Sequence, residues 1–332
     1  MTKKELVLKA FHNEPVERIP VGFWFHFLTD QEMNMAIDYP ELLDKVVEGH
    51  KKFRDEFHPD FVKMMTDGLF FRPRTSYPRF LNKPEDLYLI KPLPRDHAWF
   101  ELSVKQAKRI REVFDDDTLV YYNVFSPLFN LCNAMTNTVD PSKVLQFLLD
   151  DPDAVVYALN VLSDDLCYLL ERVFTEAKLD GLYLSVSNSG RVIPDHLYTK
   201  YVAPSEEKLI AKAKEYHEDN ILHICGWRGR TNILSVYRDY DTSVFNWAVH
   251  EEGLSLAEGK EYFHGKCVIG GFDQMPGSTI NTGTKEEIQA VVEEMIKNGG
   301  KTGVIIGADC TVPEDTPIQN LIWAREKAAE LS

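Results

Sequence analysis

The sequence predicts an α/β protein built as a single (β/α)8 TIM barrel, because eight short apolar runs alternate with long amphipathic stretches and no linker divides the chain. Several of these runs are apolar almost throughout, as expected for parallel strands that are buried on both faces. The length of 332 residues suits one barrel of this kind. We therefore expect one domain spanning residues 1–332, with an N-terminal helical extension and an insertion on the barrel rim.

Each predicted strand is rich in β-branched and aromatic residues and is bounded by Gly, Pro, Asn or Asp. In order, the predicted strands cover residues 19–25, 61–66, 118–125, 181–187, 220–225, 243–249, 267–272 and 303–308. The helical patterns between them cover residues 39–57, 101–114, 142–177, 194–216, 254–263, 284–298 and 317–331. Thr284 and Glu287 have the spacing of a capping box, and Asn298-Gly299-Gly300 is typical of a helix end. Residues 70–100 are rich in Pro and Arg and lack periodicity, so they form the predicted rim insertion.

Acidic residues outnumber basic ones, and the formal net charge of −15 at pH 7 argues against nucleic acid as a partner. No apolar run approaches the ~18 residues that a membrane span requires, and no secretory signal is present. We therefore expect a cytoplasmic protein without a membrane partner. The five cysteines are an odd, sparse set, so they are expected to be reduced thiols or metal ligands. Three of them, Cys132, Cys167 and Cys267, fit core positions.

The carboxyl ends of the strands are the places where a barrel of this kind carries its active site. These ends offer His26, Asp67, Ser126 with Asn130, Asn188, His223 with Cys225, Trp247 with His250, Asp273 and Cys310. His223 and Cys225 stand out because alternate residues of a strand project on the same face. Cys310 follows the last strand, and a closed barrel brings all its strand ends around one mouth.

One imidazole and two thiolates form a ligand set that is typical of Zn2+. Three protein ligands leave a fourth position open, as in catalytic zinc sites, and its expected occupant is water or a substrate thiol. Spacing alone leaves a second interpretation open, in which His223 and Cys225 are a satisfied pair in the core.

The chain resembles the uroporphyrinogen decarboxylase superfamily over nearly its whole length, from Val16-Glu17-Arg18-Ile19-Pro20-Val21 to Thr316-Pro317-Ile318-Gln319-Asn320. The decarboxylases proper use no metal and carry an Arg-Gln-Ala-Gly-Arg segment, where this chain has Phe25-His26-Phe27-Leu28-Thr29-Asp30. The cobalamin-dependent methyltransferases of the superfamily, such as those that methylate coenzyme M, carry His-x-Cys and a distant Cys before a Pro-x-x-Thr-Pro-like stretch. Here His223, Cys225 and Cys310 occupy those positions, and Pro313-Glu314-Asp315-Thr316-Pro317 follows.

The resemblance implies a zinc-dependent methyltransferase. In one direction, the sulfur of a substrate thiol attacks the methyl carbon of methylcobalamin or a related corrinoid and leaves Co(I). In the other direction, the methyl group passes from a methylated O, N or S donor to the corrinoid. The chain lacks the Asp-x-His-x-x-Gly corrinoid-binding signature, so the corrinoid is expected on a partner protein. The other partner is a small-molecule thiol or methyl donor that the residues do not identify, and a homodimer fits the family.

The resemblance also implies a catalytic role for Asp67, whose position is similar to that of an acidic site residue of the family. Its carboxylate is a candidate to orient a donor, to assist protonation or to contact His223, with a helix cap as the alternative. Ala308-Asp309 departs from the Gly-containing turns of many relatives before Cys310. The residues expected to bind substrate are His26, Asn188, Arg228, Trp247 and Asp273.

For several of these residues an ordinary surface or structural role is also open. Arg228 suits an anionic tail on the substrate, or it is an ordinary surface charge. His26 and Asp273 line the mouth, or they are a solvated rim histidine and a turn aspartate. Aromatic residues at Tyr121, Tyr122, Phe125, Trp247 and Phe272 are candidates for an aromatic lining.

Two other functions stay open at this point. Decarboxylation of uroporphyrinogen is supported by the overall resemblance and by Asp67. A non-catalytic barrel with a structural metal is the third interpretation, and it requires a fourth protein ligand.

Overall fold

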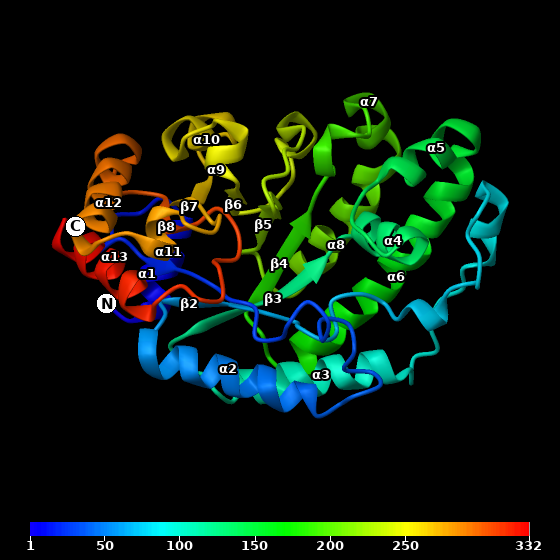
Figure 1. Ribbon diagram of the computed structural model, residues 1–332, viewed down its shortest axis with the longest axis horizontal. Helices are drawn as coiled ribbons and strands as arrows, with labels where there is room; N and C mark the ends of the chain where they lie inside the picture. Colours follow the sequence, from blue (N-terminus) through cyan, green and yellow to red (C-terminus); the bar gives the residue numbers. More distant parts are fainter. Residues whose placement is uncertain (332) are drawn as a thin grey trace.

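Eight parallel strands form one sheet that curves into a nearly closed barrel in the computed structural model, which describes residues 1–331 (Figure 1). The sheet order is β1-β8-β7-β6-β5-β4-β3-β2, so β1 and β2 are its two ends. This arrangement confirms the predicted (β/α)8 fold. The strands are β1 (Val21–Gly22), β2 (Phe61–Met64), β3 (Leu119–Phe125), β4 (Gly181–Val186), β5 (Ile221–Ile224), β6 (Val244–Trp247), β7 (Cys267–Phe272) and β8 (Val304–Ala308).

Side chains, rather than a hydrogen-bonded ladder, fill the seam between β1 and β2. The Asp60 carboxylate, next to β2, accepts a hydrogen bond from the Val21 N–H at 2.9 Å and two more from the Arg18 guanidinium. The ring of Phe61 lies against Gly22, where any side chain would collide with it. These contacts replace backbone pairing, and β1 is therefore much shorter than the first predicted strand.

Helices surround the sheet, and both chain ends lie on the same side of the molecule (Figure 1). None of the helices in residues 1–331 combines the length and apolar composition needed to cross a membrane. The α-helices are α1 (Lys3–Phe11), α2 (Leu42–Phe57), α3 (Ala98–Arg111), α4 (Pro127–Thr136), α5 (Ser142–Asp150), α6 (Pro152–Glu176), α7 (Asp195–Leu197), α8 (Ala203–Lys214), α9 (Val249–Glu252), α10 (Leu256–Tyr262), α11 (Thr279–Thr282), α12 (Lys285–Gly299) and α13 (Ile318–Glu330). Short 3-10 turns are η1 (Arg74–Ser76), η2 (Pro84–Leu89), η3 (Ser189–Arg191) and η5 (Leu234–Tyr237), and η4 (Tyr198–Val202) is a π-helical turn.

The predicted helix over residues 142–177 is in fact two helices, α5 and α6. Pro152 cannot donate a backbone hydrogen bond to the preceding turn, so the helix cannot run through it. Asp151 instead caps the new helix α6, because its side chain accepts a hydrogen bond from the Ala154 N–H at 3.1 Å. The predicted capping box at Thr284 and the helix end at Gly300 are both confirmed for α12.

The predicted helix over residues 194–216 is also interrupted, by the π-helical turn η4. Pro204, in the first turn of α8, has no N–H for the carbonyl one turn earlier, and the widened turn precedes it. Helix α4 was not predicted, although Ser126 caps it and Pro127 begins it, which is a typical start signal. The uninterrupted helix over residues 194–216 and the missing helix α4 have the same cause. Both predictions followed the hydrophobic periodicity and gave too little weight to proline and cap signals.

The barrel interior is filled by residues that alternate along the strands, including Phe61, Tyr121 and Tyr183. The intervening residues face outward and pack under the helices in the larger core cluster. Helix α1 is the predicted N-terminal extension, and its residues Val7 and Phe11 join the interior cluster rather than the outer one. The amino-terminal helix therefore covers one end of the barrel, and the other end is left for the functional site.

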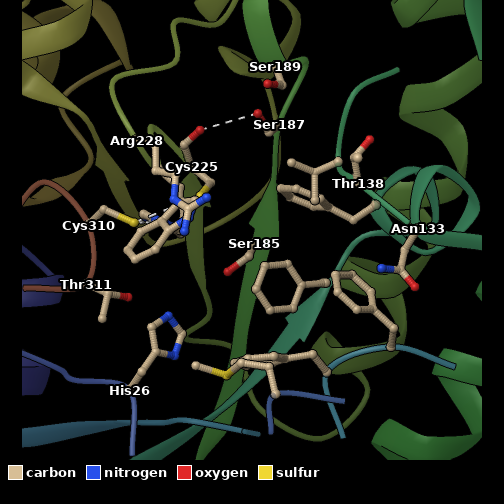
Figure 2. A pocket seen from close by; sticks show the side chains of 18 of the residues that line it. His26, Asn133, Thr138, Ser185, Ser187, Ser189, Cys225, Arg228, Cys310 and Thr311 are labelled. Atoms are coloured by element: carbon tan, nitrogen blue, oxygen red, sulfur yellow. Dashed lines mark hydrogen bonds between the residues drawn. The ribbon is translucent and has the colours of Figure 1, made fainter. Parts of the chain in front are cut away.

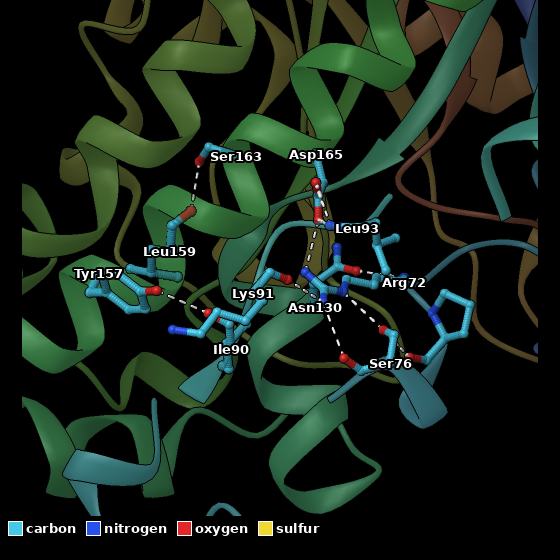
Figure 3. Close-up of polar contacts among 11 residues, drawn as sticks. Arg72, Ser76, Ile90, Lys91, Leu93, Asn130, Tyr157, Leu159, Ser163 and Asp165 are labelled. Atoms are coloured by element: carbon cyan, nitrogen blue, oxygen red, sulfur yellow. Dashed lines mark hydrogen bonds and ion pairs between the residues drawn. The ribbon is translucent and has the colours of Figure 1, made fainter. Parts of the chain in front are cut away.

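The segment between β2 and α3 is the predicted rim insertion, and one buried ion pair secures it to α6 (Figure 3). Arg72 and Asp165 pair at 2.8 Å, and both side chains are almost fully buried. The same guanidinium donates hydrogen bonds to Ser76 and to the Lys91 carbonyl, while the carboxylate accepts one from the Leu93 N–H. A single charge pair thus holds the rim insertion at Ser76, Lys91 and Leu93, although this segment has little regular structure.

Candidate metal centre

Three predicted ligands from two distant parts of the chain meet at the carboxyl end of the barrel. His223 lies on β5, Cys225 follows that strand directly, and Cys310 follows β8. Cys310 Sγ lies 3.9 Å from Cys225 Sγ and 3.5 Å from His223 Nε2. All three ligand atoms lie within 4.8 Å of one another, and all three residues are buried. Within residues 1–331 no fourth His, Cys, Asp or Glu joins this group.

The spacing of these atoms fits a tetrahedral zinc ion. With Zn–S bonds of about 2.3 Å and a Zn–N bond of about 2.0 Å, tetrahedral angles separate two sulfurs by about 3.8 Å and a sulfur from a nitrogen by about 3.5 Å. The observed separations of 3.9 Å and 3.5 Å match these two edges. The donor set of one imidazole and two thiols also suits a borderline-soft divalent ion.

Asn246 on β6 determines which nitrogen of His223 faces the site. The Asn246 amide group donates hydrogen bonds to the carbonyls of Ile269 and Ala308, so its Oδ1 is the atom left to accept. Oδ1 accepts from the Tyr183 hydroxyl at 3.0 Å and from His223 Nδ1. His223 therefore carries its proton on Nδ1, and the lone pair of Nε2 points at Cys310.

The two thiols are chemically unequal. Their mutual hydrogen bond, together with burial, raises the pKa of Cys225 well above the usual thiol range. The same hydrogen bond lowers the pKa of Cys310 well below that range, and the nearby charge of Lys63 favours the thiolate further. One thiolate therefore forms readily at this site, as a metal ligand requires.

Asp309, directly before Cys310, anchors the loop that carries this cysteine. Its buried carboxylate accepts hydrogen bonds from the His250 N–H at 2.9 Å, from His250 Nδ1 at 2.8 Å and from the Gly271 N–H at 3.2 Å. The loop before Cys310 is therefore held by three hydrogen bonds to two residues, His250 and Gly271.

A cavity of about 380 Å³ opens beside the three ligands. Figure 2 shows Cys225, Cys310 and Arg228 on one side of it and Asn133 and Thr138 on the other. Part of its wall is made of phenylalanine rings, with Phe125 at the centre of the group, 4.9 Å from Phe70 and 5.2 Å from Phe71 between ring centroids. Other lining residues are His26, Met33, Lys63, Met65, Phe129, Ser185, Ser187, Trp227, Arg230 and Thr311.

Asp67 is fully buried and lies beside His26 rather than beside His223. Its carboxylate accepts hydrogen bonds from His26 Nδ1 at 3.1 Å and from the backbone N–H groups of Phe27 and Leu28. The carboxylate therefore orients the His26 ring and fixes the loop that carries it. Of the three alternatives for Asp67, the contact with His223 is not made, because Asn246 occupies that place.

Three of the residues expected to bind substrate lie outside the cavity lining. Asn188 is buried and binds Ile193 twice, through Nδ2 to its carbonyl and through Oδ1 to its N–H. Trp247 faces away from the barrel interior, and its indole N–H donates to the Leu254 carbonyl. Asp273 caps its own loop, because its Oδ1 accepts a hydrogen bond from the backbone two residues on. Strand-end position alone selected these residues, whereas alternation along the strand decides which ones face inward.

The other two, His26 and Arg228, do line the cavity. The Arg228 side chain is 63% exposed and pairs with Asp30 at 2.9 Å, so it lies at the opening. Of the aromatic residues predicted to line the mouth, Phe125 does so, whereas Phe272 packs in the outer core.

Sequence reasoning missed two polar residues of the barrel interior, Asn246 and Lys63. Each is the polar residue inside a short buried strand, in Val244–Trp247 and Phe61–Met64 respectively. A lone polar side chain within an otherwise apolar strand is the signal that points to both, because burial of such a group requires a partner.

Comparison with known proteins agrees with this architecture. The uroporphyrinogen decarboxylase (URO-D) family model matches residues 2–331, and the chain therefore belongs to this family. Among solved structures, a methyltransferase from Methanosarcina mazei is similar, with a TM-score of 0.76 and 16% identity over 100% of this chain and 99% of that chain. A B12-independent methionine synthase from Shewanella sp. W3-18-1, in complex with selenomethionine, has a TM-score of 0.57 and 14% identity over 95% of this chain and 97% of that chain. A search of curated proteins found no match.

Proposed function

We propose that this protein is a zinc-dependent methyltransferase that moves a methyl group between a corrinoid protein and a thiol or methylated small molecule. One observation carries the proposal: His223, Cys225 and Cys310 form a three-ligand set that faces a cavity, and the two separations from Cys310 match those of a tetrahedral zinc ion. Structural zinc sites usually have four protein ligands, so a set of three favours a catalytic ion over a structural one.

When bound, zinc would hold the sulfur of a thiol as a thiolate, or polarise the heteroatom of a methylated donor. The protein's own contribution is orientation. Asn246 keeps His223 in the tautomer that presents Nε2, and Asp309 fixes the loop of Cys310. The corrinoid would supply the cobalt that carries the methyl group, and His223, Cys225 and Cys310 would hold the zinc that positions the reacting sulfur or methylated heteroatom.

His26 is the proposed proton carrier of the site, and Asp67 is its positioning residue. Asp67 holds His26 Nδ1, so the other ring nitrogen is available on the cavity side. A thiol entering the site loses a proton, and a methylated donor gains one when its methyl group leaves. An imidazole at the cavity wall serves either direction.

Arg228 and the phenylalanine wall belong to the same proposal. Arg228 at the opening suits an anionic group on a reactant, and the wall around Phe125 suits an apolar surface. The corrinoid is proposed to arrive on a separate protein, because the chain lacks the binding signature for it.

Zinc analysis and a methyl-transfer assay test the proposal together. We expect about one zinc per chain, and methyl exchange between methylcobalamin and a panel of thiols, followed by the colour change of the corrinoid. Cys225→Ser and Cys310→Ser should lose both zinc and activity, whereas Cys167→Ser, on helix α6, should keep both. A wild-type protein that binds no zinc would remove the basis of the proposal.

Membership of the uroporphyrinogen decarboxylase family supports a second candidate, decarboxylation of uroporphyrinogen. This reaction needs no metal ligands, so a Cys225→Ser/Cys310→Ser double variant distinguishes the two. Undiminished turnover of uroporphyrinogen by that variant would establish the decarboxylase instead.

A further inference from the structure

Lys63 is a buried cation that the proposed reaction has not yet used. It lies on β2, is 4% exposed and lines the same cavity as the three ligands. Within residues 1–331 its ammonium makes no hydrogen bond and no ion pair, and its contacts are the faces of two aromatic rings. An ammonium carries three donors, and since no group in the described part of the chain accepts from Lys63 they are available to a group bound in the cavity.

The surroundings of Lys63 place it next to the metal ligands. Its Nζ lies 5.0 Å from the ring centroid of Trp24 and 4.4 Å from that of Tyr183. These two rings also pack around His223, at 6.4 Å and 5.8 Å between centroids. The Tyr183 hydroxyl in turn donates to Asn246, the residue that orients His223.

The electrostatics of this lysine follow from the same neighbours. Burial lowers the pKa of Lys63 to about 8, and the charges of Cys310, Cys225 and Asp67 act in the opposite direction. Cys310, the thiol with the lowered pKa, makes the largest of these opposing contributions. The cation is retained in the barrel interior because anionic groups collect beside it.

We propose that Lys63 is the counter-charge for an anionic reactant bound at the open side of the His223, Cys225 and Cys310 set. This inference rests on the proposed metal site. A divalent ion with two thiolates and a neutral imidazole has no net charge, so an anionic fourth partner leaves one negative charge in a buried cavity. The Lys63 ammonium cancels it.

The consequence is a preference for a class of reactant. Groups that bind as anions, such as a thiol that becomes a thiolate, are favoured over neutral donors of similar size. In that case the sulfur keeps the S–H electron pair and the proton passes to His26, the proposed proton carrier of the site. Lys63 thereby contributes to selectivity through charge, independently of the shape of the cavity.

Ligand binding to cobalt-loaded protein tests the inference without an activity assay, because Co2+ occupies such sites and reports on its ligands through its visible spectrum. The probes are azide, an anion, and imidazole, a neutral ligand. The variant is Lys63→Met, which keeps an unbranched apolar stem. The control is Lys91→Met, which removes an exposed lysine of the rim segment that also lies over a tyrosine ring, 5.9 Å from Tyr157.

We expect Lys63→Met to weaken azide binding by about 10- to 100-fold and to change imidazole binding by less than about twofold, because only the anion interacts with the lost charge. Lys91→Met should change neither. The melting temperature of the metal-free Lys63→Met variant should stay close to that of the wild type, because the lost attraction to Cys310 and Asp67 is offset by the removal of a desolvated charge.

Three results would overturn the inference. They are unchanged azide affinity in Lys63→Met, equal loss of azide and imidazole, and a metal-free variant that melts earlier or does not fold, which would make Lys63 a structural residue. Failure of the wild type to bind Co2+ or Zn2+ would instead refute the proposed function, so the two failures are distinguishable.

Discussion

Replacement of Asn246 by leucine should weaken the metal site without touching any metal ligand. Asn246 is fully buried, and its Oδ1 accepts hydrogen bonds from His223 Nδ1 and from the Tyr183 hydroxyl. Its amide group donates to the carbonyls of Ile269 and Ala308. Leucine has a similar volume but no acceptor for the His223 ring, which is then free to rotate and to change tautomer.

The size of the effect follows from the role of such outer partners. Loss of a hydrogen-bond partner of a ligating histidine typically lowers metal affinity by about 10- to 100-fold, which is about 1.4 to 2.7 kcal/mol. The free energy of unfolding should fall as well, by roughly 2 to 4 kcal/mol, because the buried polar groups that bind Asn246 lose their hydrogen bonds.

Two measurements separate these effects. Competition with a chromophoric chelator gives the zinc affinity, and urea unfolding of the metal-free protein gives the stability. Asn220→Leu is the matched control, since Asn220 is also fully buried and accepts from the Leu182 N–H while donating to the His217 carbonyl, but precedes β5 at the other end of that strand. Both variants should lose stability, and only Asn246→Leu should lose zinc affinity. A folded Asn246→Leu protein that binds zinc as tightly as the wild type would refute the reasoning.

Two further predictions concern stability. Burial lowers the pKa of His50 from 6.5 to about 4, and its neutral ring both donates to the Val46 carbonyl and accepts from the Met65 N–H. Below about pH 6.5 His50 is protonated in the unfolded chain, whereas in the folded chain it is protonated only below about pH 4. The contribution of His50 to the free energy of unfolding is therefore complete above pH 6.5, and up to about 3 kcal/mol of it is lost on acidification. Urea unfolding between these pH values should show a shallower loss for His50→Gln, and identical slopes would contradict the assignment. Arg72→Met should cost about 3 to 5 kcal/mol, because it leaves the buried Asp165 carboxyl without its partner and raises its pKa beyond the value of about 6 that it has beside Arg72, and Arg72→Met/Asp165→Leu should recover much of this loss in the same assay. A double variant no more stable than the single one would show that the hydrogen bonds, not the charge pair, secure the rim segment.

Site residues predicted from the alternation of side chains along a strand lie in the site, whereas residues predicted only because they end a strand often do not. His223 and Cys225 were found by alternation, and they do share one face. Trp247 was selected because it ends a strand, yet the residue that faces inward there is its neighbour Asn246, whose register partner on β5 is His223. The sequence contained that information, since alternation along β6 follows from the strand alone.

The amino-acid sequence by itself determined the alternation of strands and helices, the barrel class and the shared face of His223 and Cys225, because these depend on patterns within a few residues. Only the tertiary structure decided which side chains meet. Cys310 lies 3.5 Å from His223 although 87 residues separate them, and this distance depends on how the sheet curls. Lys63 lies beside the ligands for the same reason, because β2 and β5 face one another only across an interior that exists once the barrel has formed.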